Sequence, residues 1–130
     1  EMSKEFNTGY FAAKTVEDVL THELAHKSHW DSAKALYKSK PKMYNTVEGA
    51  KKVLDESLEN YVKNVQAQEM QYLDKYISRN AERNFEEGSV NEIVAEVAVL
   101  GDKLEDKVLL NLVSEVLKDG TRVRNNGSTK

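Results

Sequence analysis

Apolar residues recur every three or four positions along most of this chain, the spacing that places side chains on one face of an α-helix. The 130 residues include one proline and six glycines, far fewer turn residues than an all-β domain with many hairpins requires. A chain of this length suits a single hydrophobic core. We therefore expect one mainly α domain over residues 1–120, followed by a disordered tail at 121–130.

Two long helices are expected in the first half of the chain. Thr15 and Asp18 form an acidic variant of the capping box, and the helix that they start should run to about residue 38, just before Pro41. The apolar stripe expected on this helix consists of Val16, Val19, Leu20 and Leu24, and could include Ala25. The second helix should begin at Thr46 and continue to between residues 72 and 77.

Shorter helices are expected in the second half. The polar stretch 78–88 is interpreted as a fraying helix end or a loop. Ser89 and Glu92 have capping-box spacing, so a third helix should begin there and end at Gly101. A fourth helix should follow, with Gly120 as its C-cap.

Composition excludes several classes of function. The formal net charge of −3 argues against nucleic acid as a partner, because phosphate binding needs a basic surface. The absence of cysteine excludes disulfides, thiol nucleophiles and cysteine-based zinc sites. No apolar run approaches the roughly 18 residues of a membrane span, so no membrane association is expected.

All three histidines lie between residues 22 and 29, and this stretch begins His-Glu-Leu-Ala-His. On a helix, His22 and His26 lie one turn apart on the same face, so both imidazoles can reach one Zn²⁺. Glu23 lies about 100° around the helix from His22, where its carboxylate could hold and deprotonate a zinc-bound water. The pattern predicts a zinc site with His22 and His26 as ligands and Glu23 as general base.

The third histidine is a poor candidate for the same ion. His29 lies about 10 Å beyond His22 along the helix axis, too far for both to form bonds of about 2.1 Å to one metal. A site made of His26 and His29 is a weaker alternative, and His29 could also line a cleft or pack beside Trp30. The metzincin pattern is excluded, because Ser32 stands where its third histidine would be and His29 where its glycine would be.

A carboxylate on a later helix is the other common source of a third zinc ligand. Glu92 and Glu96 are four residues apart, so they share one face of the third expected helix. Either could be the ligand, and both could instead be solvated surface carboxylates. Weaker candidates lie on the second expected helix: Glu48, Asp55 and Glu56.

Three segments together resemble a known family. They are THELAHKSHW at residues 21–30, ISRNA at 77–81 and NEIVAEV at 91–97. The combination is similar to zincin domains of the anthrax lethal-factor type, in which an HExxH helix is followed by a helix that reads E-[FIL]-x-A-E. Similar small zincin-like metallopeptidase domains occur in phage head (minor capsid) proteins, with a motif like HELxHKxHWD.

The resemblance implies roles for residues outside the HExxH helix. Glu92 would be the third zinc ligand, and Glu96 would bond the other ring nitrogen of a ligand histidine. The family's oxyanion-stabilising tyrosine is missing, since Asn80 stands in its motif position. Asn80, Tyr76 or His29 could contact the oxyanion or the substrate in its place. This departure bears on activity more than on metal binding.

The expected function is therefore that of a zinc-dependent metallopeptidase of phage or prophage origin that acts in head morphogenesis. Its partners would be a peptide or protein substrate and phage capsid proteins, in the bacterial host cytoplasm or the virion. Residues 7–13 could form an edge strand on which an extended substrate lies. The alternative is a catalytically inactive zincin-fold module with a structural or protein-interaction role.

Overall fold

A computed structural model describes residues 11–40 and 42–117, and this part of the chain is helical and contains no β-strand. Its helices are α2 (Val16–Ser39), α3 (Val47–Gln68), α4 (Tyr72–Tyr76), α5 (Arg79–Glu86) and α6 (Asn91–Leu100). The 3-10 helix η1 (Gly101–Lys103) follows, and a last helix starts at residue 107 and continues through residue 117. The prediction of a mainly α chain is confirmed. None of the described helices has both the length and the apolar character needed to cross a bilayer.

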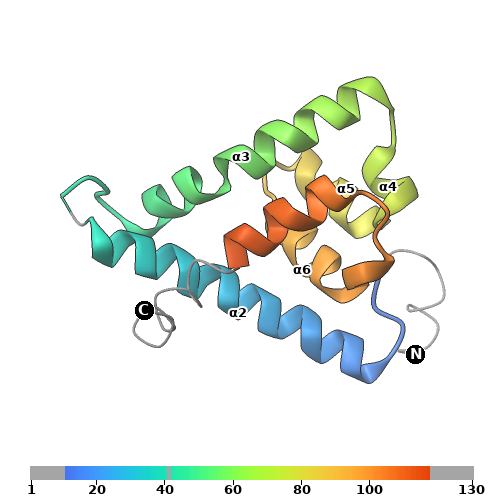
Figure 1. Cartoon of the computed structure of the whole chain (residues 1–130), viewed down its shortest axis with the longest axis horizontal. Coiled ribbons are helices and arrows are strands. Elements are labelled where there is room, and N and C mark those ends of the chain that lie inside the picture. Colours follow the sequence, from blue (N-terminus) through green and yellow to red (C-terminus); the bar gives the residue numbers. More distant parts are fainter. Residues whose placement is uncertain (1–10, 41, 118–130) are drawn as a thin grey trace.

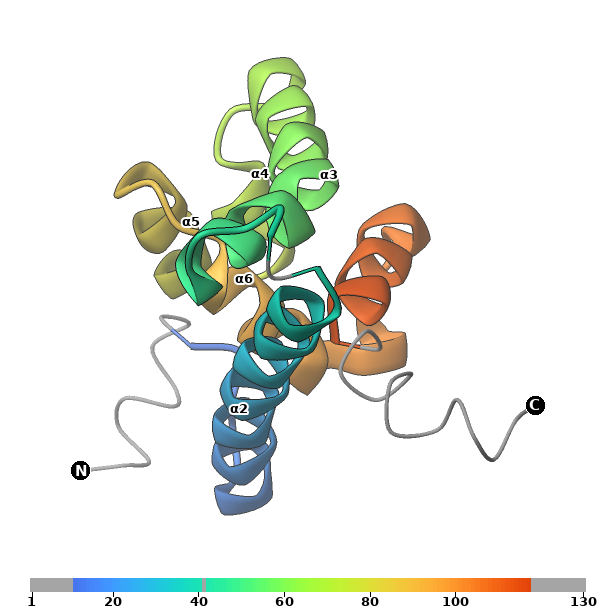
Figure 2. The same ribbon diagram turned by 90° about the vertical axis from the view of Figure 1, so that its left-hand side faces the viewer.

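The two long helices, α2 and α3, diverge like the arms of a V from the turn that joins them (Figure 1). The helix α6 lies near the middle of the molecule in both views (Figures 1 and 2) and packs against α2 and α5. Its residues 93–97 are all buried. This central position allows side chains of α6 to meet those of α2, which precede them by about 70 residues.

Among the described residues, the main hydrophobic cluster is built by helices other than α2. Its large side chains include Leu58, Leu73, Ile93 and Leu109. The helix α2 instead buries Ala25, His29, Ser32 and Ala33. The predicted apolar stripe on this helix is confirmed at Ala25 but otherwise largely wrong, because Val16, Leu20 and Leu24 are each more than half exposed. The buried face of α2 is the one that carries the histidines.

Side-chain caps mark the starts of three helices. Thr15 and Thr46 each accept a hydrogen bond from the backbone N–H three residues later, at 3.0 Å, which confirms the N-cap predicted at Thr15 and the helix start predicted at Thr46. Ser78 accepts the same bond at 3.1 Å and starts α5. The interpretation of residues 78–88 as a loop or fraying end is therefore wrong. Only Ala81 is buried in α5, so the apolar pattern is too weak to indicate this helix.

Backbone geometry corrects two further boundaries. The helix α3 ends before Gln71, whose φ of 64° is left-handed, so it is shorter than expected. The predicted capping box at Ser89 does not form, because Val90 is the N-cap of α6 and the Glu92 side chain is directed toward α2. Gly101 ends α6 with a φ of 54°, as predicted.

Three predictions lie partly or wholly outside the described residues. They are the C-cap at Gly120, the tail at 121–130 and the edge strand at 7–13. Within the last of these, residues 11–13 are described and form a bend and irregular backbone instead of a strand. Ala12 and Ala13 are buried, so this stretch packs against the domain.

Candidate metal centre

His22 and His26 lie on the face of α2 that packs against α6. Their rings are nearly perpendicular, in a T-shaped arrangement with 4.8 Å between the ring centroids. Both side chains are partly buried, with exposed fractions of 14% and 27%. The one-turn spacing therefore brings both imidazoles to one point of the interface between these helices.

Glu92, in the first turn of α6, meets both histidines. Glu92 Oε1 lies 2.9 Å from His22 Nε2, and Glu92 Oε2 lies 3.1 Å from His26 Nε2. One potential ligand atom from each of the three residues lies within 4.8 Å of the other two. A tetrahedral ion with bonds of about 2.1 Å holds its ligand atoms about 3.4 Å apart. Small shifts of these side chains would let them surround such an ion.

Two asparagines of α5 hold Glu92 in place. Asn80 Nδ2 donates a hydrogen bond to Glu92 Oε1 at 2.7 Å, and the backbone N–H of Glu92 donates to Asn84 Oδ1 at 3.1 Å. Asn80, predicted as an oxyanion or substrate contact, instead orients the third member of the cluster. Sequence reasoning missed Asn84, although its four-residue spacing from Asn80 would have indicated a shared helix face.

Glu96 lies behind the cluster and is fully buried. Its Oε1 accepts a hydrogen bond from the backbone N–H of Ala12 at 2.8 Å. Its Oε2 lies 3.0 Å from His22 Nε2, which is an ion-pair distance, but the geometry is not that of a hydrogen bond. Glu96 therefore approaches the same ring nitrogen as Glu92, whereas the resemblance implied a contact with the other nitrogen of the ring.

The cluster has a surplus of negative charge. Two carboxylates, Glu92 and Glu96, face the imidazoles of His22 and His26. In the protein alone, the close contacts with the carboxylates of Glu92 and then Glu96 raise the pKa of His22 to about 9, against the effect of burial. The hydrogen bonds with His22 and His26 hold the pKa of Glu92 well below its usual range. A divalent cation would compensate the carboxylates while both imidazoles stay neutral, which is the form that binds metals.

Glu23 follows His22 directly and is exposed. Its side chain forms no hydrogen bond or ion pair with any other residue of the described ranges. Its carboxylate is therefore free to contact a molecule that reaches the cluster from solvent.

Two other predicted contact residues have partners elsewhere. His29 is only 1% exposed, and its Nε2 lies 2.7 Å from Asp55 Oδ1 on α3. Tyr76 packs against the ring of Tyr72, with 5.0 Å between the ring centroids. Burial therefore keeps His29 from meeting a substrate, and the ring contact of Tyr76 is made within α4.

Comparison of the chain with family models, curated proteins and solved structures found no match. The geometry of the cluster formed by His22, His26 and Glu92 is therefore the basis for assigning a function.

Proposed function

We propose that this chain is a zinc-dependent peptide hydrolase. The observation that supports the proposal is the convergence of His22, His26 and Glu92 from two helices that are far apart in the sequence. Two imidazoles and one carboxylate form a ligand set typical of catalytic zinc, which keeps its fourth position for water or substrate. Partial exposure of all three side chains leaves the cluster open to a substrate.

Each neighbouring residue has a distinct part in this proposal. A zinc ion held there would supply a Lewis acid and lower the pKa of a bound water to about 7. Glu23, exposed beside His22, would accept the proton of the attacking water and deliver it to the leaving amine. Asn80 would keep the Glu92 carboxylate directed at the histidines through its hydrogen bond of 2.7 Å.

The biological setting is proposed from the sequence motif. The stretch THELAHKSHW resembles that of zincin-like domains in phage head proteins, so we propose a role in phage or prophage head morphogenesis. The substrate would be a peptide or protein, with capsid proteins as partners, in the bacterial host cytoplasm or the virion.

A catalytically inactive zincin-like module, with a structural or protein-interaction role, is the second candidate. It is favoured by the contacts of the residues expected to replace the family's tyrosine. Asn80 bonds Glu92, Tyr76 packs on Tyr72, and His29 is buried against Asp55. A metal could still bind at such a site, but stabilisation of an oxyanion would then depend on the metal alone.

Zinc content and peptidase activity of the purified protein, measured together, test the proposal. We expect about one zinc per chain, a sharp loss of zinc in Glu92→Ala, and no loss in Glu105→Ala, an exposed control. Glu23→Gln should keep the zinc and lose cleavage of a peptide library. Undiminished zinc in Glu92→Ala would refute the ligand assignment, and retained cleavage in Glu23→Gln would refute the mechanism. Zinc without cleavage in the wild-type protein would support the inactive module.

A further inference from the structure

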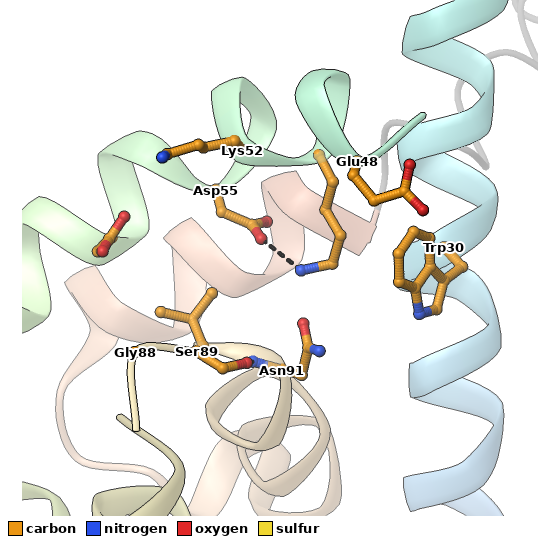
Figure 3. Close-up of a pocket in the computed structure, with 10 residues that line it drawn as sticks. Trp30, Glu48, Lys52, Asp55, Gly88, Ser89 and Asn91 are labelled. Atoms are coloured by element: carbon orange, nitrogen blue, oxygen red, sulfur yellow. Dashed lines mark hydrogen bonds and ion pairs between the residues drawn. The ribbon is translucent and has the colours of Figure 1, made fainter. Parts of the chain in front are cut away.

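A pocket of about 430 Å³ opens between α2, α3 and the turn that leads into α6. Figure 3 shows Trp30 on α2 and Glu48 and Asp55 on α3 on two of its walls, with Asn91 at the start of α6 forming part of its floor. Its volume lies in the range of pockets that hold small ligands or single side chains. The metal cluster does not use any of these four residues.

The pocket adjoins the metal cluster. Trp30 lies one helical turn after His26 on α2, about 6 Å along the helix axis, and Asn91 directly precedes Glu92. A peptide that lies across the cluster could therefore place a neighbouring side chain in the pocket.

The charges at the Trp30 end of the pocket are unbalanced. Lys51 Nζ lies 5.5 Å from the centroid of the Trp30 ring, but Asp55 pairs with this ammonium at 2.8 Å. Glu48 has no ion-pair or hydrogen-bond partner among the described residues. Its carboxylate points toward Trp30 on the same pocket, whereas the Lys52 side chain extends away from both (Figure 3). A negative charge next to an aromatic ring is therefore left for a ligand.

A polar atom of the floor also lacks a partner. Asn91 Oδ1 is buried and accepts no hydrogen bond from any described residue. A buried acceptor without a donor destabilises the structure. Asn91 Oδ1 and the Glu48 carboxylate are both acceptors without a donor among the described residues, so both favour a ligand rich in donors.

We propose that the Trp30–Glu48 end of this pocket binds the cationic side chain of an arginine or lysine in a peptide. The Glu48 carboxylate would pair with the cation, and the Trp30 ring would pack on the methylene groups of the side chain. The assignment of this pocket to a substrate residue rests on the proposed peptidase function, whereas the binding itself does not.

Trp30 is the single tryptophan of the chain, so its fluorescence reports on this pocket. The probes are acetyl-Ala-Ala-Arg-Ala-Ala-amide and two analogues with citrulline or glutamate in place of arginine, titrated into the full chain with and without zinc. Citrulline keeps the shape of arginine and removes its charge. We expect the arginine peptide to shift the emission of Trp30 and to bind about tenfold more tightly than the citrulline peptide.

Variants on α3 connect the preference to Glu48. Glu48→Gln should weaken binding of the arginine peptide about tenfold, and Glu56→Gln, an exposed control outside the pocket, should leave it unchanged. Equal affinities for the arginine and citrulline peptides, preference for the glutamate peptide, or an unaffected Glu48→Gln would overturn the proposal.

The same experiment separates the two proposals. If the wild-type protein binds no zinc but still prefers the arginine peptide, the proposed peptidase function is refuted. The pocket then remains as a binding site for cationic peptides. If the protein binds about one zinc per chain but does not prefer the arginine peptide, only the pocket proposal is refuted.

Discussion

Asp55 joins a buried histidine and a largely buried lysine, and its replacement tests the energetics of the contact between α2 and α3. Asp55 Oδ1 lies 2.7 Å from His29 Nε2, and Asp55 Oδ2 accepts a hydrogen bond from Lys51 Nζ at 2.8 Å. The side chains of Asp55, His29 and Lys51 are 9%, 1% and 13% exposed. The variant Asp55→Ala would therefore leave an imidazole and an ammonium without their partner in a largely dry environment.

The cost of this change follows from the burial. Removing one partner of a buried ion pair typically destabilises a protein by about 3–5 kcal/mol. We expect the lower end of this range, about 3 kcal/mol, because the partly exposed Lys51 can extend toward solvent. For a domain of this size, the melting temperature falls by roughly 3–5 °C per kcal/mol, so a decrease of about 9–15 °C is expected for Asp55→Ala.

Urea denaturation followed by circular dichroism measures this loss. Glu56→Ala, at the next and exposed position of α3, should change the free energy of unfolding by less than about 0.5 kcal/mol. The double variant His29→Leu/Asp55→Leu should be more stable than Asp55→Leu alone, because no buried imidazole is left unpaired. A cost below about 1 kcal/mol for Asp55→Ala, or strict additivity in the double variant, would refute the reasoning.

Two further predictions concern the zinc affinity of an Asn80 variant and the loss of folding stability at low pH. Asn80→Ala should lower the affinity for zinc by about 10- to 100-fold without changing the stoichiometry at saturation, in a competition titration with a chelating dye. Equal affinities for this variant and for the exposed control Asn60→Ala would contradict a positioning role. Burial raises the pKa of Asp55, but His29 and Lys51 together lower it more, so the net pKa lies below its usual value. The stability that Asp55 contributes is therefore complete above a pH of about 4 and is lost as the pH falls through the lowered pKa. The difference in unfolding free energy between wild type and Asp55→Asn should shrink over this range. A constant difference from pH 6 to pH 2.5 would contradict the prediction.

The sequence alone determined the local features of this protein. Thr15 caps α2 as predicted, and the second long helix begins at Thr46 as predicted, because a cap depends on residues only three positions apart. The shared face of His22 and His26 follows in the same way from the period of one helix. The helix α5 was missed, because it buries only Ala81 and so lacks an apolar stripe.

The tertiary structure decided which of these side chains meet. Glu92 and Glu96 share one face of α6, yet Glu92 contacts both histidines, while Glu96 is buried between His22 and the backbone of Ala12. His29 follows the same motif on α2, but Asp55 of α3 removes it from solvent. Capping and periodicity act within a few residues, whereas these contacts depend on where α3 and α6 cross α2. The packing of the whole core sets those crossings, so no local pattern in the sequence contains them.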